Sequence, residues 1–141
     1  MTAIAYRNGV MAADSLICFG DTKTYDPNKV RLVKGHLIGI SGEDCPDLKA
    51  FDRWYFRKSK RLDAFGGEFT ALVVTPKMEV LLVESDGSVH PLKQEFWAIG
   101  AGADICLGAM DTGANAARAV QAAIKWNSKC AGRVQQVRFP R

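Results

Sequence analysis

A short hairpin is encoded by residues 2–15, which read Thr2-Ala3-Ile4-Ala5-Tyr6-Arg7-Asn8-Gly9-Val10-Met11-Ala12-Ala13-Asp14-Ser15. Two extended runs, Ala3–Arg7 and Val10–Asp14, flank Asn8-Gly9, a dipeptide that suits a type I′ turn because both residues tolerate positive φ. Counting residue pairs outward from this turn places Asp14 beside the N-terminal residue. Strict alternation sends the Thr2 and Asp14 side chains to opposite faces, so the pattern alone does not predict a contact between them.

The rest of the chain continues in hairpins and grouped helices rather than in strand–helix–strand alternation. Further strands are expected at Val30–Val33, Leu37–Ser41, Phe69–Thr75, Val80–Glu84, Trp97–Gly100 and Val134–Phe139. A first helix is expected to start near Asp44–Pro46 and to end at Asp63–Gly67, and two more are expected at Ala103–Met110 and Ala114–Trp126. Gly20–Asn28 is expected to be a loop. This order predicts an α+β fold with mainly antiparallel sheets.

Length and composition are those of one globular domain spanning residues 1–141. Hydrophobic residues make up 48% and charged residues 24% of the chain, and no apolar run approaches the roughly 18–20 residues of a membrane span. No signal peptide is visible. The four cysteines form no C-x-x-C pair and are expected to be reduced thiols in the cytoplasm, with neither a metal site nor a disulfide framework. A net charge of +4 fits an acidic partner without requiring one.

Candidate chemistry centres on Thr2. A threonine hydroxyl is a weak nucleophile, but the free α-amine of the same residue, with an ordinary pKa of about 7.7–8.0, can serve as its base. Lys29 opens a strand and would lower the pKa of both groups, with Asp14 as the available counter-ion. Gly42 ends a strand, where its N–H can point at a developing oxyanion. Each residue alone also has an ordinary structural interpretation. Asp14 could be a turn cap, Lys29 a solvated strand end and Gly42 a turn glycine.

Two competing functions are disfavoured by the sequence. Gly100-Ala101-Gly102 follows a strand and opens a helix, but Ile105 occupies the third glycine position of a dinucleotide fingerprint. The first expected helix carries basic residues that could bind nucleic acid, yet Asp47 and Asp52 share it, so a solvated face is the better interpretation. One of its aromatic residues, Trp54 or Phe56, is expected to be exposed and to mark a subunit contact.

Ordered blocks along nearly the whole chain resemble proteasome β subunits and the bacterial HslV peptidase. The blocks are Thr2–Ala5, Gly9–Ser15, Gly20, Asn28–Val30, Leu37–Gly42, Phe69–Val74, Ala98–Gly102, Gly108–Met110 and Gly113–Val120. The resemblance implies the four-layer αββα sandwich of N-terminal-nucleophile hydrolases and a threonine-type endopeptidase without a cofactor. Met1 would be removed, and Thr2 would be the nucleophile with its own amine as base.

The resemblance also implies roles for other residues. Lys29 would tune the hydroxyl, Asp14 would hold Lys29, and the Gly42 N–H would be the oxyanion donor. Two segments match the strands between which such enzymes bind an extended peptide by main-chain pairing; their residues are Ile17, Cys18, Ile40 and Ser41. Members of the family assemble into rings of identical or similar subunits, often served by an ATP-dependent unfoldase.

Three supporting positions depart from the family pattern. The family usually has serine where this chain has Ala101, and proteasome subunits have an aspartate and a serine where this chain has Asn127 and Cys130. The segment between Gly42 and Phe69 has room for one helix where relatives have two. Two alternatives to the peptidase therefore remain: a catalytically inactive subunit with an assembly or scaffold role, and an amidase acting on a non-protein amide.

Overall fold

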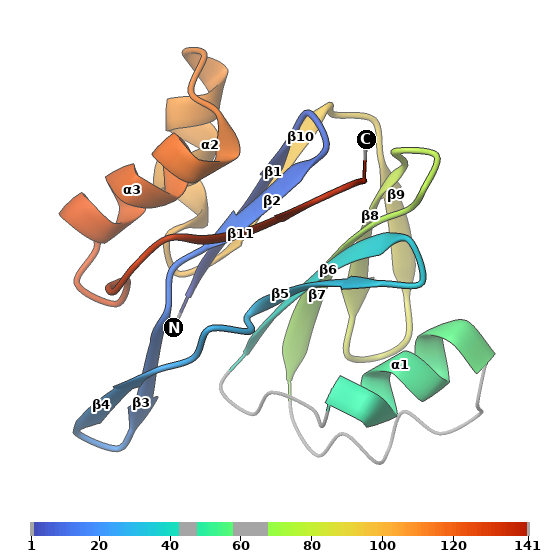
Figure 1. Ribbon diagram of the computed structural model, residues 1–141, viewed down its shortest axis with the longest axis horizontal. Coiled ribbons are helices and arrows are strands. Elements are labelled where there is room, and N and C mark those ends of the chain that lie inside the picture. The colour runs from blue at the N-terminus through green and yellow to red at the C-terminus, as the bar shows by residue number, and fades with distance from the viewer. Residues whose placement is uncertain (1, 43–47, 58–67, 141) are drawn as a thin grey trace.

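The computed structural model describes residues 2–42, 48–57 and 68–140. Its strands form two larger antiparallel sheets and one small hairpin, and the helices lie on the outer sides of the larger sheets (Figure 1). The first sheet has the order β10 (Phe96–Gly100), β1 (Ala3–Arg7), β2 (Val10–Ala13) and β11 (Gln135–Arg138). The second has the order β5 (Val30–Val33), β6 (His36–Gly42), β7 (Phe69–Val74), β8 (Val80–Glu84) and β9 (Val89–Leu92). The hairpin pairs β3 (Leu16–Phe19) with β4 (Thr22–Tyr25).

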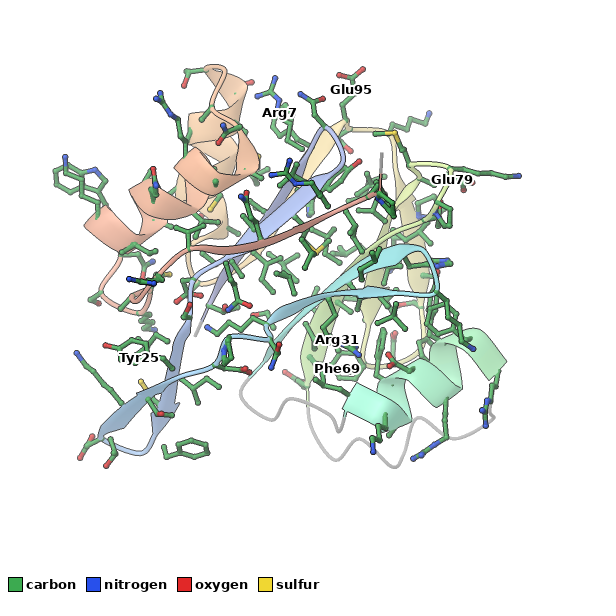
Figure 2. The ribbon with its side chains drawn as sticks, in the orientation of Figure 1. Arg7, Tyr25, Arg31, Phe69, Glu79 and Glu95 are labelled. Atoms are coloured by element: carbon green, nitrogen blue, oxygen red, sulfur yellow. The ribbon has the colours of Figure 1, made fainter. Side chains whose placement is uncertain are left out.

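The layers follow the order helices, sheet, sheet, helix. The helices α2 (Ala103–Asp111) and α3 (Ala116–Trp126) cover the first sheet, and α1 (Leu48–Arg57) covers the second (Figure 1). Arg31 and Phe69 lie on the face of the second sheet that α1 covers (Figure 2), where Arg31 pairs with Asp52 and Phe69 packs edge-on against Phe51. The expected four-layer αββα sandwich with antiparallel sheets is confirmed. No helix of the described stretches is long and apolar enough to span a membrane.

Strand β1 is buried on both faces, and the sizes of its residues match the two neighbours. Ala3 and Ala5 face the helices, and these small side chains let α3 approach closely. Ile4 and Tyr6 face the second sheet and fill the wider space between the sheets. Alternation with period two therefore places small residues on one face and large residues on the other. The strand that begins next to Thr2 is a rigid part of the core.

Most of the expected elements are present, with informative differences. The Asn8-Gly9 turn is confirmed, with both φ angles positive at 51° and 79°. The loop expected over Gly20–Asn28 is wrong in part, because Thr22–Tyr25 is strand β4 of a hairpin that turns at Gly20. Strands β3 and β9 were not among those expected from local patterns. Strand β9 contains a proline, which an edge strand tolerates.

Helix α1 also differs from expectation in the exposure of its aromatic residues. Trp54 and Phe56 are both half-buried and both pack on the cluster around Phe51, so the expectation that one of them is exposed is wrong. His36 lies edge-on to Phe56, with ring centroids 5.0 Å apart, and covers part of that side. The expected ends of this helix, Asp44–Pro46 and Asp63–Gly67, lie outside the described residues.

Candidate active site

The ends of strands β1 and β2 bring Thr2 and Asp14 into direct contact. Thr2 lies immediately before β1, Asp14 lies immediately after β2, and the Asp14 N–H donates to the Ala3 carbonyl at 3.1 Å. The Thr2 Oγ1–H donates to Asp14 Oδ1 at 2.7 Å. Alternation does not prevent this contact, because both residues lie beyond the strand ends, where the pleat no longer fixes side-chain direction.

Lys29 joins this pair from the second sheet. It immediately precedes β5, and its Nζ donates to Thr2 Oγ1 and to Asp14 Oδ1, both at 2.9 Å. The exposed fractions of the Lys29 and Asp14 side chains are 8% and 0%, so the ion pair is buried. A buried pair of this kind is costly to break, because removing one partner leaves the other charge uncompensated. The structure thus brings Thr2, Asp14 and Lys29 together.

The Asp14 carboxylate is surrounded by hydrogen-bond donors. Besides Thr2 and Lys29, the Ala3 N–H donates to Oδ1 at 3.1 Å and the Ala131 N–H donates to Oδ2 at 3.1 Å. Four hydrogen-bond donors thus occupy the two oxygens of this carboxylate. The Lys29 ammonium lies where it can stabilise negative charge on the threonine oxygen.

The Gly100-Ala101-Gly102 loop, between β10 and α2, closes over Thr2. The Gly102 N–H donates to the Thr2 carbonyl at 3.1 Å. Gly100 has φ +94°, and a Cβ at that position would lie 2.3 Å from the Thr2 carbonyl oxygen. A glycine is needed here for both its φ and the close approach. These two glycines, which match only part of a dinucleotide fingerprint, instead fix the main chain of Thr2.

The three supporting positions gather around this loop. Asn127 Nδ2 donates to the Ala101 carbonyl at 3.0 Å and so ties the end of α3 to the loop. Cys130 is 3% exposed, and its Sγ would lie 3.0 Å from a Cβ on Gly102. Burial, with the nearby Asp14 charge, raises the pKa of the Cys130 thiol to about 11. Cys130 is therefore an uncharged thiol at neutral pH, and like Cys18 and Cys106 it is free of disulfides.

Comparison with solved structures finds close matches over almost the whole chain. BPH from Thiobacillus denitrificans in complex with epoxomicin matches with a TM-score of 0.68 and 20% identity over 99% of both chains. The structure of Thiobacillus denitrificans BPH alone matches with a TM-score of 0.67 and 19% identity, over 99% of this chain and 98% of the other. Eukaryotic HslV from Trypanosoma brucei matches with a TM-score of 0.67 and 15% identity, over 97% of this chain and 98% of the other. The chain has an HslV-like, proteasome-type fold.

That likeness confirms the resemblance suggested by the sequence blocks at the level of fold. By sequence, no protein-family model and no curated protein matches the chain. The fold is therefore shown by structural matches over 97–99% of the chain, whereas the roles of individual residues depend on the contacts of the site.

A groove of about 970 Å³ adjoins the site of the HslV-like chain on the side of the second sheet. Its lining residues are Ser41, Gly42, Glu68, Phe69, Thr70, Glu84, Ser85, Asp86 and Gly100. The β5–β6 ladder ends at Val30–Gly39, whereas the β6–β7 ladder continues to Gly42–Phe69, so residues 40–42 extend past β5. Gly42 is required by close packing, since a Cβ there would lie 2.5 Å from the Glu68 carbonyl oxygen.

Of the four residues expected to bind substrate, only Ser41 lines this groove. Ile40 is 6% exposed with its side chain in the core beneath α1. Ile17 and Cys18 lie on β3 and pair with β4, and neither lines the groove. Tyr25 of the same hairpin, labelled in Figure 2, lines a second, mostly apolar hollow of about 570 Å³.

One residue of the site region gave no signal in the sequence. Gln135, the first residue of β11, hydrogen-bonds through its side chain to the main chain of Asp14, Asp26 and Lys29. A glutamine in a short strand belongs to no motif, so only the structure reveals it. In the described parts of the chain, no three histidine, cysteine, aspartate or glutamate side chains gather as metal ligands would.

Proposed function

We propose that this chain is a threonine-type endopeptidase whose nucleophile is the Thr2 hydroxyl, activated once removal of Met1 frees the Thr2 amine. The observation that carries the proposal is the position of Lys29 Nζ, 2.9 Å from both Thr2 Oγ1 and Asp14 Oδ1. A buried cation beside a threonine oxygen is costly to maintain and useful where that oxygen becomes negatively charged. The match to BPH in complex with epoxomicin supports the same assignment.

The reaction would proceed in two steps. Thr2 Oγ attacks the carbonyl carbon of the scissile peptide bond, and the hydroxyl proton passes to the Thr2 amine. The tetrahedral intermediate collapses to an ester on Oγ, and the amine gives the proton to the departing nitrogen of the substrate. Water then attacks the ester and restores the threonine. Lys29 lowers the energy of the oxygen as it loses its proton, and Asp14 fixes Lys29 in place.

The groove provides a place for the substrate main chain. The Gly42 N–H at the end of β6 would donate to the oxyanion of the intermediate. Residues 40–42, which extend past β5, would pair with an extended peptide as an added strand. Because Ile40 is buried, its main chain rather than its side chain would make this contact. Ile17 and Cys18 on β3 would border the opposite side of the peptide.

Assembly and partners extend the proposal. Ring formation from copies of this chain and delivery of unfolded protein by an ATP-dependent unfoldase are consistent in kind with an HslV-like fold.

Two alternative functions have specific support. Ala101, Asn127 and Cys130 lack the hydroxyl and carboxylate groups of the family, which favours an inactive scaffold subunit. An amidase on a non-protein amide would use the same Thr2 chemistry with a different ligand in the groove.

Epoxomicin is expected to add once to the processed protein. It is a peptide epoxyketone, so the Thr2 hydroxyl can add to its ketone and the amine can open its epoxide, with no leaving group. Intact mass spectrometry should show loss of one methionine residue and a gain of the whole inhibitor mass. Thr2→Ala should gain no mass and should lose peptide hydrolysis by at least about 10³-fold.

The control for this experiment is Thr112→Ala, which removes an exposed hydroxyl at the end of α2 that bonds only the local main chain. It should label as the parent does. Retention of Met1 with no added mass on the parent would contradict the peptidase proposal and favour the scaffold subunit. Labelling that persists in Thr2→Ala would show that another nucleophile reacts.

Peptides with lysine or arginine near the scissile bond are expected to be the better substrates. Glu68, Glu84 and Asp86 line the groove, and none of its described lining residues is basic. Hydrogen bonds from Ser88 lower the pKa of Asp86, which keeps it ionised at neutral pH. A partly exposed ion pair contributes up to about 1 kcal/mol, so kcat/KM should exceed that for a neutral counterpart by about fivefold.

Matched peptides that differ only at one charged residue would measure this preference. Glu84→Gln and Asp86→Asn together should reduce it, with Glu68 left as the acidic residue of the groove, and salt should weaken it in the parent. Glu79→Gln is the control, because Glu79 lies at the opposite end of the second sheet, away from the groove (Figure 2). Faster cleavage of the acidic counterpart would contradict the expectation.

A further inference from the structure

Gln135 makes three hydrogen bonds through one side-chain amide. Its Nε2 donates to the carbonyl of Asp14 at 3.1 Å and to that of Asp26 at 2.7 Å. Its Oε1 accepts from the Lys29 N–H at 2.9 Å. All three partners are main-chain groups, and two of them belong to the residues that hold Thr2. The side chain therefore bonds to the backbone from which the Asp14 and Lys29 side chains project.

Those two residues come from different parts of the fold. Asp14 follows β2 of the first sheet, and Lys29 precedes β5 of the second. Between them lie the β3–β4 hairpin and the turn at Asp26, so the intervening chain does not set their spacing. Their neighbours Ala13 and Val30 share the core between the sheets, which brings the two backbones near each other. Gln135 joins the two directly at the end of the sheets where Thr2 lies.

We propose that Gln135 is a positioning residue that sets the distance between Asp14 and Lys29 and thereby places the Lys29 ammonium on Thr2 Oγ1. This inference rests on the proposed peptidase function for its catalytic consequence. An amide matches the need, since it supplies two N–H donors for the two carbonyls and one oxygen for the Lys29 N–H. Catalytic geometry is sensitive to such support, because a misplacement of about 1 Å can lower a rate by about 10²-fold.

Neighbouring contacts reinforce the same connection. The Asp26 N–H donates to the Ser15 carbonyl at 2.8 Å, and the Ser15 N–H donates to the Ala131 carbonyl at 3.0 Å. The Ser15 hydroxyl donates to the Arg133 carbonyl. The segment before β11 is thus fastened to the Asp14 end of the hairpin, and Gln135 extends that connection to Lys29.

Gln135→Glu is the sharpest test, because it keeps the shape and removes both donors. An ionised carboxylate would face two carbonyl oxygens, so the chain should separate there. We expect kcat for peptide hydrolysis to fall by about 10- to 100-fold. KM should change by less than about threefold, because the residues that line the groove are not touched. A fall in kcat with unchanged KM distinguishes misplacement of the reacting groups from loss of substrate binding.

Two control variants on the same strand distinguish misplacement of Lys29 from a general loss of fold stability. Gln136→Glu makes the same chemical change on the adjacent, exposed residue and should leave kcat within about twofold. Val137→Ala removes apolar contacts between the sheets and should destabilise the fold without lowering kcat well below its melting temperature. Equal kcat losses in Gln135→Glu and Val137→Ala would overturn the inference in favour of a purely structural role.

A double-mutant cycle with Lys29→Met tests the inference without any activity. Gln135→Glu is expected to raise the unfolding equilibrium constant in both the parent and the Lys29→Met background. If Gln135 places Lys29, the increase should be about fivefold larger in the parent, where Lys29 is present. Additive effects would overturn the inference. Failure of epoxomicin to label the parent would instead refute the proposed function, and the cycle would still decide the role of Gln135.

Discussion

Lys29→Met is expected to lower peptide hydrolysis by about 10³-fold and to destabilise the fold by about 3 kcal/mol. Methionine keeps most of the apolar stem but removes the ammonium, which lies 2.9 Å from Thr2 Oγ1 and from Asp14 Oδ1. The hydroxyl then loses the cation that favours its deprotonation, and Asp14 becomes a buried carboxylate without its counter-ion. Steady-state kinetics and urea unfolding of the same preparation would measure the two effects.

Arg31→Met is the matched control for this substitution. It breaks the other described ion pair, between Arg31 and Asp52, whose side chains are 18% and 26% exposed. A partly exposed pair contributes up to about 1 kcal/mol, so its loss should cost less than that and leave kcat unchanged. A Lys29→Met protein that hydrolyses peptides at the parent rate would contradict the role given to the ammonium.

Gly100→Ala is expected to destabilise the chain by about 3–5 kcal/mol and to abolish hydrolysis. The added Cβ meets two costs: a φ of +94° that an alanine rarely adopts, and a position 2.3 Å from the Thr2 carbonyl oxygen. Backbone strain contributes about 1–3 kcal/mol and overpacking a similar amount. Relief of the clash requires Thr2 to move, which takes its hydroxyl away from Lys29.

Gly113→Ala separates the cost of a positive φ from the cost of the steric clash. Gly113 has φ +107°, yet a Cβ there would have no atom within 4 Å. We expect a loss of about 1–2 kcal/mol from strain alone, with kcat unchanged. Thermal unfolding and kinetics of both variants would show the difference. Equal stability losses would mean that the approach of Gly100 to Thr2 carries no cost.

Local patterns in the sequence predicted most of the fold. The Asn8-Gly9 turn, the alternating strands and the alanine-rich helix near the C-terminus each depend on neighbouring residues, and the structure contains them all. Local patterns missed three strands, β3, β4 and β9. Strand β3 is a short apolar run of four residues, whereas β4 is exposed and polar and β9 contains proline. Such strands lack the apolar periodicity that identifies half-buried ones.

The site was predicted less completely, for a physical reason. Thr2, Asp14 and Lys29 could be named as a group, but strand alternation argued against contact between the first two, because it does not apply beyond the ends of a strand. Gln135 left no trace, since its partners are main-chain groups 106 to 121 residues away in sequence. A hydrogen bond to main chain places no demand on the identity of the partner residue.

The separation of the two sheets has a consequence for how this chain can diversify. Thr2 and Asp14 lie at the ends of the two central strands of the first sheet, next to β1, which is buried on both faces. Nearly all residues of the groove belong instead to strands β6, β7 and β8 and the turn after them. Mutations can therefore accumulate in the groove proposed to bind substrate while the surroundings of the proposed nucleophile stay constant. Libraries confined to positions 68, 70 and 84–86 should yield altered selectivity at little risk to folding.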